Sequence, residues 1–511
     1  MNRRGFIQTA TAAGALNSIL PGAEPDPALV RATEAVLAGI PAAEADPERP
    51  IYHFHPPSNW TNDPNGTIYY KGWHHLFYQL NPFASRLGSQ HWGHARSRDL
   101  VNWEHLPIAI WPSVERGERA IFSGGAAIAA DGRPRILYTS IGQPQPEQWL
   151  ASPKDDDLFV WEKFPGNPVL TQSAHSAGPI SQWRDPFLFR EGGATYMVCG
   201  GGTAAGRAQV QLYRATKPDF TEWKHLGAVF QTLDRESRNF ECPNLFPLDG
   251  KWVMIVSPNR VCEYWIGDLD VGRVQFTPQA HGILDAGDAY ASNISVDDKG
   301  RTLLWLWGRT NTAQGKGWGS VITMPRILTI GPDGYLRQRP APEFERLRRA
   351  VKNFPAIGLE TPFVPEDVAT DAAEIEAEFS GTGTFGLELR RSSAGKPGVT
   401  VSIQGGYVTV GSARAFVGNA ERYKVRVFLD KRCIEVYVND GAAAVYNPIE
   451  AGLTDLGMMV FGGAATGRGF AGGAPPAAGG RGGASPLPPR LESLRVWPMK
   501  AAKFSMEHFH V

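Results

Sequence analysis

Between residues 51 and 330 the chain is a uniform succession of short runs rich in Val, Ile, Tyr, Phe and Trp, each bounded by Gly, Asp, Asn or Pro. Such runs are typical of β-strands joined by turns. No stretch here keeps the 3.6-residue period of a helix, which argues against helix-covered parallel sheets. Roughly 280 residues of short strands fit a β-propeller or a large β-sandwich. No clean repeat of blade length is visible, so the pattern leaves both folds open. The runs include residues 67–70, 75–79, 135–139, 195–199, 252–256 and 302–307.

A second region of strand-like runs follows between residues 373 and 496, and its alternation predicts a β-sandwich. The charged segment at 339–352 predicts a short helix or connector, within a linker at 339–365. The sandwich domain is then expected at 366–500, with a Gly/Ala/Pro-rich flexible loop at 462–489. Its runs are residues 374–379, 385–390, 399–403, 423–429 and 433–438.

The amino terminus resembles a twin-arginine export signal. Arg3 and Arg4 precede an uncharged run at residues 9–20, and we expect the signal to span residues 1–23. An ordinary amino-terminal helix is the alternative. Residues 24–49 predict a short helix and a linker. No later segment is long and apolar enough to span a membrane, so we expect a periplasmic or extracellular protein with no membrane attachment after export.

The balance of charge is even, with 51 Lys and Arg against 51 Asp and Glu. Nothing in it indicates a nucleic acid as partner. The four cysteines show neither the spacing of a metal site nor a disulfide framework.

Three acidic residues stand in similar aromatic settings. Asp63 lies in WTNDPNG (residues 60–66), Asp185 in WRDPFLF (183–189) and Glu241 in FECPNLF (240–246). Asp-Pro and Asn-Gly favour tight turns, which predicts that Asp63 is held on a constrained bend. Asp-Pro also recurs elsewhere in the chain as a plain turn former, so each motif alone has a structural explanation.

The surroundings of the three acids predict different protonation behaviour. Glu241 is flanked by apolar residues, which favour a raised pKa, as a general acid requires. Asp185 follows Arg184 and is expected to stay ionised. Hydrolysis of a glycosidic bond with retention needs two carboxyl groups roughly 5 Å apart, one as nucleophile and one as acid and base.

In this order and spacing, the three motifs resemble those of glycoside hydrolase family 32, the group of invertases, levanases, inulinases and fructanases. The likeness extends over about residues 50–500. It includes HLFYQLNPF (75–83), HWGHARSRDLVNWEH (91–105), FSGG (122–125), DAYAS (288–292) and WGSVITMPRILTI (318–330). This resemblance implies an all-β fold, with a five-bladed β-propeller catalytic domain at 50–338 followed by a β-sandwich.

The resemblance also implies the roles of the three acids. Asp63 would be the nucleophile that forms a covalent fructosyl-enzyme, Glu241 the acid/base, and Asp185 the stabiliser of the transition state. No metal or cofactor is implied. The positions that would line the fructose subsite are Asn62, Gln79, Trp92, Phe122, Ser123, Arg184, Tyr290 and Trp307.

Four positions depart from the family pattern. Thr61 stands where Met is usual, Trp183 where Phe is common, and Asn244 where Asp is frequent. Leu87 falls near the position where sucrose-cleaving relatives often carry a Trp at the outer subsite. The resemblance therefore does not decide whether the substrate is sucrose or a fructan. None of these departures removes a catalytic carboxylate.

Three alternatives remain beside a retaining β-fructosidase. A fructosyltransferase would use the same fold with sugar as acceptor, and a related enzyme could act on another furanoside such as an arabinan. A carbohydrate-binding protein without turnover is the non-enzymatic alternative. Seven histidines lie between residues 53 and 105, and the pairs His53/His55 and His91/His94 have spacings that can bind a metal. The resemblance places His91 and His94 in a block without a metal, and no cysteine cluster supports a metal site. The expected partner is a fructoside, and the oligomeric state is open.

Overall fold

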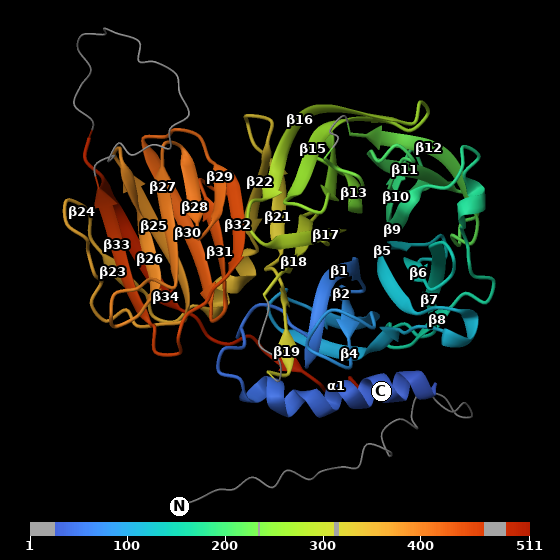
Figure 1. The fold of residues 1–511 in the computed structure, drawn as a ribbon, viewed down its shortest axis with the longest axis horizontal. Coiled ribbons are helices and arrows are strands. Elements are labelled where there is room, and N and C mark those ends of the chain that lie inside the picture. Colours follow the sequence, from blue (N-terminus) through green and yellow to red (C-terminus); the bar gives the residue numbers. More distant parts are fainter. Residues whose placement is uncertain (1–25, 233–235, 311–315, 464–486, 511) are drawn as a thin grey trace, which may run out of the picture.

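The computed structural model describes residues 26–232, 236–310, 316–463 and 487–510. These residues form a ring of β-sheets followed by a two-sheet β-sandwich, with one long helix beneath the ring (Figure 1). The predicted all-β fold of a β-propeller followed by a β-sandwich is therefore confirmed. The predicted export signal at 1–23 and most of the predicted loop at 462–489 lie outside the described residues.

Strands between Asn59 and Pro340 form five antiparallel sheets, and each sheet is continuous in the chain apart from added short strands. In the order of the chain, the strands of the first three sheets are β1 (Asn59–Tyr70), β2 (Trp73–Asn81), β3 (His91–Ser97) and β4 (Trp103–Ile110); β5 (Ala120–Ile128), β6 (Pro134–Ile141), β7 (Glu147–Pro153) and β8 (Trp161–Lys163); and β9 (Ser181–Glu191), β10 (Ala194–Gly202), β11 (Ala208–Ala215) and β12 (Trp223–Gln231). Those of the last two are β13 (Glu241–Leu248), β14 (Lys251–Ser257), β15 (Cys262–Asp270) and β16 (Gln275–Asp285); and β17 (Ala289–Val296), β18 (Thr302–Gly308), β20 (Val321–Ile322), β21 (Arg326–Ile330) and β22 (Leu336–Pro340).

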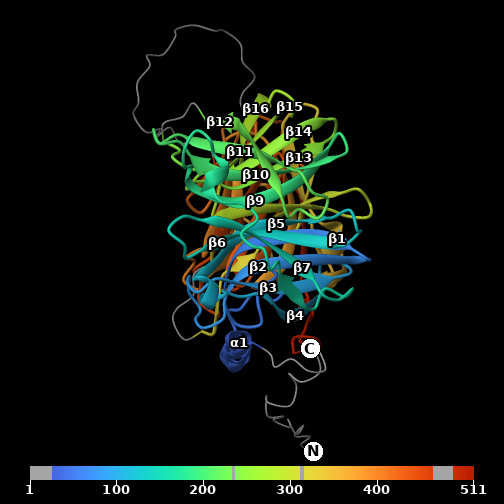
Figure 2. The ribbon, with the colours of Figure 1, turned by 90° about the vertical axis from the view of Figure 1, so that its right-hand side faces the viewer.

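The first strand of each sheet is the innermost. β1, β5, β9, β13 and β17 contact one another in sequence, and β17 contacts β1 to complete the circle. Figure 1 shows the sheets radiating from this centre, and Figure 2 shows the ring from its edge with α1 below it. The ring is also closed by hydrogen bonding, because β19 (Trp318–Gly319) pairs in parallel with the start of β1. A β-propeller gathers residues from all its sheets around one axis, so the inner strands are the natural place for a site.

The sandwich consists of a seven-stranded and a five-stranded sheet that enclose a core of Val, Ile, Leu and Phe side chains. Two short strands within the predicted linker, β23 and β24, pair with the sandwich strand β34. The strands are β23 (Lys352–Phe354), β24 (Ile357–Gly358), β25 (Ala372–Ser380), β30 (Arg422–Asp430), β31 (Cys433–Val438), β32 (Ala443–Pro448) and β34 (Arg490–Pro498) in one sheet, and β26 (Thr384–Arg391), β27 (Val399–Gln404), β28 (Tyr407–Val410), β29 (Ala413–Phe416) and β33 (Gly457–Gly463) in the other.

Both ends of the described chain pack beneath the first sheet of the ring. The helix α1 (Pro27–Ala45) begins with Asp26, whose side chain accepts a hydrogen bond from the Ala28 N–H at 2.8 Å, and Pro27 follows as the first helical residue. At the other end, β35 (Phe504–Ser505) pairs in parallel with β4. A 3-10 helix, Pro342–Leu347, leads from the ring to the sandwich.

A fully buried group of charged side chains joins the two domains. Arg326 of the ring forms ion pairs with Asp285 at 2.8 Å and with Glu435 of the sandwich at 2.9 Å. His53, which precedes β1, contacts Glu435 at 3.1 Å and Asp430 at 2.9 Å. Buried charges are tolerated only when paired and hydrogen-bonded, so this group fixes one arrangement of the ring against the sandwich.

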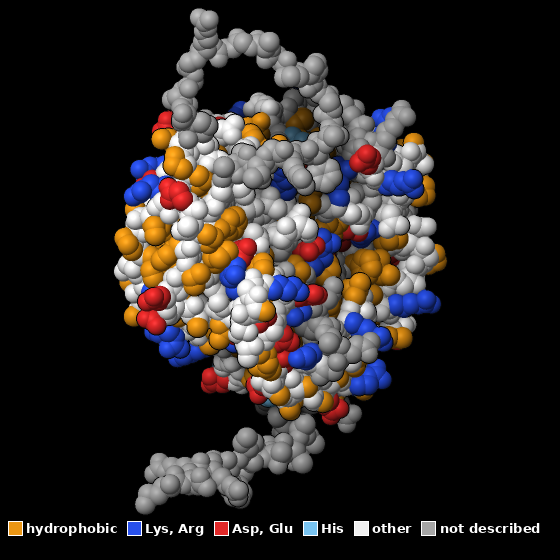
Figure 3. Space-filling model, turned by 60° about the vertical axis from the view of Figure 1, so that its left-hand side comes forward, with side chains coloured by type: hydrophobic (Ala, Val, Ile, Leu, Met, Phe, Trp, Pro, Cys, Tyr) orange, Lys and Arg blue, Asp and Glu red, His pale blue; other side chains and the backbone are white. Residues whose placement is uncertain are grey.

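The face drawn in Figure 3 carries charges of both signs. On the visible face of Figure 3, Lys and Arg side chains alternate with Asp and Glu between hydrophobic ones. Among the described residues, none of the helices has the length and apolar character needed to cross a membrane.

Candidate active site

The strand β1 carries Asp63, and the segment around it is a bulged strand. The sequence predicted a tight turn at residues 60–66. The structure corrects this prediction, because β1 is continuous from Asn59 to Tyr70 and its register against β2 shifts between Thr61 and Pro64 and again before Ile68. Pro64 and the left-handed Gly66, with φ of 50°, are accommodated by these bulges. A bulge re-aims a side chain without ending the strand.

The same irregularity recurs on every inner strand. The register shifts lie between Ile121 and Gly124 on β5, opposite Gly200 where β9 pairs with β10, between Glu241 and Asn244 on β13, and between Tyr290 and Ser292 on β17. Bulges are typical of sites where strand side chains must point to a ligand. The five bulges hold the predicted residues Asn62, Asp63, Phe122, Ser123, Arg184, Asp185, Glu241 and Tyr290.

Asp185, Cys242 and Ala291, which lie at these bulges, adopt left-handed backbone conformations although they are not glycine. The φ angles are 63° for Asp185, 45° for Cys242 and 48° for Ala291. Such conformations are costly and cluster at functional sites. Close packing at the bulges also requires Gly200, because a Cβ there would lie 1.9 Å from the carbonyl oxygen of Phe240.

Asp63 is held by donors on both carboxylate oxygens. Ser123 Oγ donates to Oδ2 at 2.5 Å and Asn62 Nδ2 donates to Oδ1 at 3.1 Å. Burial raises the pKa of Asp63, and the negative charge of nearby Glu241 adds to that rise, while both donors lower it. The site therefore brings Asp63 and Glu241 within electrostatic reach of each other, although they are far apart in the sequence.

Asp185 is buried, and its environment differs from the prediction. Its Oδ2 accepts the Cys242 backbone N–H at 2.9 Å, while Arg184 Nε lies 3.7 Å away. Burial raises the pKa of Asp185 to about 7, against the lowering effect of Arg184. The sequence-based argument took only the charge of Arg184 into account, whereas burial outweighs that charge and the Arg184 guanidinium also binds Glu241.

Glu241 also lies in a setting other than the apolar one predicted. Arg184 Nη2 donates to one carboxylate oxygen, and the Tyr290 hydroxyl donates to the other at 2.5 Å. The Tyr290 oxygen is itself placed by the backbone N–H of Asn259, at 2.9 Å. The aromatic neighbours of Glu241 in the sequence point into the core of the ring instead, as Phe240 shows with 1% exposure.

Other predicted subsite residues extend the network from Asp63. Gln79 donates through Nε2 to Ser123 Oγ at 2.9 Å and accepts from Asn62 through its carbonyl oxygen. Trp60 donates to Asn62 Oδ1 at 3.2 Å. Asn62, Gln79 and Ser123 therefore form one hydrogen-bonded group with the carboxylate, as a preorganised site requires.

The two predicted tryptophans lie behind this group. Trp92 has no exposed surface, and its Nε1 donates to the Phe122 carbonyl at 3.1 Å, so it can act only by supporting Phe122. Trp307 packs edge-on against Trp60, with ring centroids 5.9 Å apart, and donates to Ser320. Phe122 itself is partly exposed.

The structure adds residues that sequence reasoning missed. The Cys242 thiol lies 3.6 Å from Asp63 Oδ2 and 3.7 Å from Asp185 Oδ2, between the two carboxylates. Its place next to Glu241 was the only signal in the sequence. Thr139 of β6 accepts the backbone N–H of Asp185 at 2.9 Å, and no motif marked it.

Two of the departures from the family pattern have a local explanation. Asn244 Nδ2 donates to the carbonyls of Cys242 at 2.9 Å and Ser292 at 3.0 Å, which a carboxylate could not do. It thereby ties β13 to β17. Thr61 is buried and donates to the Gln79 carbonyl at 3.2 Å. Leu87 is 57% exposed, and nothing in the structure explains its identity.

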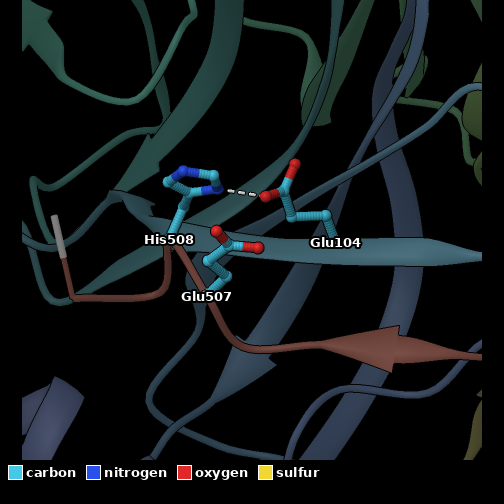
Figure 4. A group of neighbouring side chains, drawn as sticks. All are labelled: Glu104, Glu507 and His508. Carbon is cyan, nitrogen blue, oxygen red and sulfur yellow. Dashed lines mark hydrogen bonds and ion pairs between the residues drawn. The ribbon is translucent and has the colours of Figure 1, made fainter.

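Histidines of the segment between residues 53 and 105 pack inside the first sheet. His94 Nε2 lies 3.0 Å from His75 Nδ1 and its ring stacks on Phe77, while His91 contacts the Ser89 carbonyl. Among the described residues, the one group of three side chains with metal-ligand spacing is Glu104, Glu507 and His508, beside the carboxyl-terminal strand (Figure 4). Arg96 already binds Glu104 there, at 2.6 Å.

The propeller gathers three carboxylates on bulged inner strands, within a network of hydroxyl and amide donors. This arrangement contains the groups that a glycoside hydrolase requires. Residues 53–340 match the domain described as "Glycosyl hydrolases family 32 N-terminal domain", and residues 343–449 match "Glycosyl hydrolases family 32 C terminal". The chain belongs to glycoside hydrolase family 32.

Relatives within this family include proteins of known name. The chain is 30% identical over 460 residues to the sucrose-6-phosphate hydrolase of Bacillus subtilis (strain 168), covering 80% of this chain and 91% of that protein. It is 29% identical over 488 residues to the levanase of the same organism, covering 81% and 68%. The structure of fructan 1-exohydrolase IIa from Cichorium intybus matches with a TM-score of 0.77 and 27% identity, covering 90% of this chain and 99% of that one. A further structure of that enzyme is a complex with 1-kestose.

Proposed function

We propose that the protein is a retaining β-fructosidase that releases fructose from the non-reducing ends of fructo-oligosaccharides, fructans or sucrose through a covalent fructosyl-enzyme. The observation that carries this proposal is the convergence of Asp63, Asp185 and Glu241 at the centre of the ring, on bulges of the inner strands β1, β9 and β13. The names of the relatives support the substrate class, since they include a levanase, a sucrose-6-phosphate hydrolase and a fructan exohydrolase.

In the first step the Asp63 carboxylate attacks the anomeric carbon of the fructosyl unit. The bond from that carbon to the leaving oxygen breaks, and Glu241 gives its proton to this oxygen. Tyr290 and Arg184 each donate to one oxygen of Glu241, which fixes the orientation of its carboxyl group. Asp185 binds sugar hydroxyls while positive charge develops on the ring.

In the second step Glu241 takes a proton from water, and the oxygen attacks the anomeric carbon. The ester to Asp63 breaks, and fructose leaves with net retention. When the ester breaks, Asp63 regains its negative charge. Hydrogen bonds from Ser123 and Asn62 stabilise this charge, because both side chains already donate to the carboxylate oxygens.

An activity panel tests the proposal. Purified protein is incubated with sucrose, 1-kestose, inulin and levan, and free fructose is measured beside any transfer product. Fructose release from at least one substrate supports the hydrolase, and transfer products in excess of fructose support a transferase. Release from none of them contradicts the proposal. Asp63→Ala should abolish turnover, and an active Asp63→Ala variant contradicts the role of nucleophile.

Glu241→Gln gives an independent check on the roles. This variant should lose most activity on sugar leaving groups and least on activated aryl fructosides, which need no protonation. An equal loss on both classes of substrate contradicts the role of general acid.

We also propose export through the twin-arginine signal at residues 1–23. The paired Arg3 and Arg4 support it. Export of a reporter fused to these residues should stop on replacement of both arginines by lysine, and unchanged export would contradict this part.

A further inference from the structure

We propose that Thr139 is a positioning residue for the reaction, because its hydroxyl holds Asp185 in the left-handed bulge conformation that aims the carboxylate at the sugar. This inference rests on the proposed function for the role of Asp185. Thr139 has no place in any of the acid motifs, and it lies on the second strand of the neighbouring sheet.

The bulge leaves Asp185 with a backbone donor that the sheet does not use. Where β9 pairs with β10, Arg184 faces Gly200 and Phe187 faces Val198, so Asp185 and Pro186 together oppose Cys199. Pro186 has no N–H, and the N–H of Asp185 is therefore the one donor of this pair. It points out of its own sheet and donates to Thr139 Oγ1 at 2.9 Å.

The Thr139 hydroxyl is itself oriented by a second residue. Its proton goes to Gln148 Oε1 at 2.8 Å, which leaves the oxygen lone pairs free to accept from Asp185. Thr139 of β6 and Gln148 of β7 are direct cross-strand partners, so the pleat places both side chains on one face. Both are fully buried, and water cannot replace either of them.

The carboxylate end of Asp185 is fixed independently. The Cys242 N–H donates to Oδ2 at 2.9 Å, from a residue that is also left-handed, with φ of 45°. Thr139 on the backbone and Cys242 on the side chain therefore hold Asp185 from two neighbouring sheets. A residue at φ of 63° persists only where its surroundings over-determine it. Loss of one of the two anchors should let the backbone relax and move the carboxylate.

Thr139→Val tests this inference because it keeps the shape of the side chain and removes the acceptor. Thr139→Ser restores the hydroxyl, and Ser140→Ala is the matched control. Ser140 is the next residue of the same strand, is equally buried, and its hydroxyl has no hydrogen-bond partner among the described residues. Steady-state kinetics on the best substrate of the wild-type protein and thermal melting are measured for all four proteins.

We expect Thr139→Val to lower kcat about 10- to 100-fold with KM changed less than about threefold, because only transition-state stabilisation is impaired. Thr139→Ser should recover most of the loss, and Ser140→Ala should resemble the wild type. Wild-type kcat in Thr139→Val, or an equal loss in the Val and Ser variants, overturns the inference. An inactive wild-type protein would instead count against the proposed function.

A second variant covers the case in which Thr139→Val does not fold. Gln148→Met removes the acceptor that orients the Thr139 hydroxyl and should lower kcat in the same direction by a smaller factor. A wild-type kcat in a folded Gln148→Met protein overturns the inference.

Discussion

The Tyr290 hydroxyl donates a hydrogen bond to Oε2 of Glu241 at 2.5 Å, from the inner strand of the neighbouring sheet. The same hydroxyl accepts from the Asn259 N–H at 2.9 Å and also lies 3.0 Å from the Ser257 carbonyl, but the Glu241 carboxyl group is the nearer of its two acceptors. Burial raises the pKa of Tyr290 far above its usual value, and the negative charge of Glu241 raises it further. The phenol therefore remains a donor at every working pH, and it cannot serve as a base.

Tyr290→Phe should lower kcat about 10- to 100-fold, because the acid/base loses the donor that fixes one of its oxygens. Steady-state kinetics on one fructoside would measure the loss. Tyr69→Phe is the matched control, since Tyr69 also donates to a carboxylate, that of Asp298 at 2.9 Å, but on the exposed surface. Equal kcat values for the wild type and Tyr290→Phe would show that Arg184 alone suffices.

Asp185→Asn should inactivate the protein and stabilise it at alkaline pH. Burial raises the pKa of Asp185 to about 7 in the folded protein, against an ordinary value of 3.8. The unfolded chain therefore loses this proton first, and the contribution of Asp185 to stability falls as pH rises from about 4 to 7. Above pH 7 the Asn variant avoids the cost of a buried ionised carboxylate, which amounts to about 2–4 kcal/mol. Urea unfolding at pH 4.5 and pH 8 checks the sign. Lower stability of the variant at pH 8 would show that attraction to Arg184 outweighs burial.

Glu435→Gln should destabilise the protein at neutral pH by about 3–5 kcal/mol, because it leaves Arg326 and His53 short of a buried negative partner. Although burial works in the other direction, Arg326 and His53 lower the pKa of Glu435 to about 2. The stability from this ionised group is present above about pH 4.5 and is lost as pH falls towards 2. Urea unfolding at pH 7 measures the effect.

Glu378→Gln is the comparison for that change. Glu378 forms an exposed pair with Arg422 at 3.1 Å, and such pairs contribute about 1 kcal/mol or less. A similar loss in both variants would mean that the buried group between the domains has no special role in stability.

The sequence predicted many strands of the ring and the sandwich. Each strand is a short run of buried apolar residues bounded by turn residues, and such a run can be recognised from the local sequence. The run at 433–438, for example, coincides with β31. Aromatic and Pro neighbours also singled out the three acids, which the structure places on inner strands of the ring; their catalytic roles stay a prediction. The prediction of the local backbone geometry around Asp63 was wrong. Asp-Pro and Asn-Gly indicate an irregular backbone, but whether that becomes a turn or a bulge depends on β2, which pairs with β1 on both sides of the irregularity.

The predicted charge partner of Arg184 was wrong for a related reason. Arg184 is adjacent to Asp185 in the chain, yet its guanidinium binds Glu241, 57 residues further on. Thr139 gave no signal because its role depends on two sheets meeting at the axis. Likewise, the pairing of Phe504 with Trp103 joins the end of the chain to the first sheet, which no local pattern encodes.

Replacing His105 by Phe should make the stability of the protein less sensitive to acid. His105 is buried, neither ring nitrogen has a hydrogen-bond partner among the described residues, and its ring stacks on Phe504 with centroids 6.0 Å apart. Burial lowers the pKa of His105 to about 3, far below the value of about 6.5 in an unfolded chain. Between these values the unfolded chain binds a proton that the folded protein excludes. The stability is therefore complete above pH 6.5 and falls as pH decreases towards 3, by up to about 1.4 kcal/mol per pH unit for this residue.

Urea midpoints of His105→Phe and the wild type at pH 7, 6 and 5 measure the difference in slope. At pH 7 the two proteins should be close in stability, because Phe keeps the stacking and no hydrogen bond is lost. His281→Phe is the control, since His281 stacks on Trp265 at 4.7 Å but its side chain is half exposed. Because His281 also pairs with Glu263 at 3.0 Å, its replacement should not make the protein less sensitive to acid. Burial also lowers the pKa of His75 to about 3 and that of His91 to about 4, so His105→Phe should remove only part of the acid sensitivity. An unchanged slope in His105→Phe would mean that His105 can take up a proton without unfolding of the first sheet.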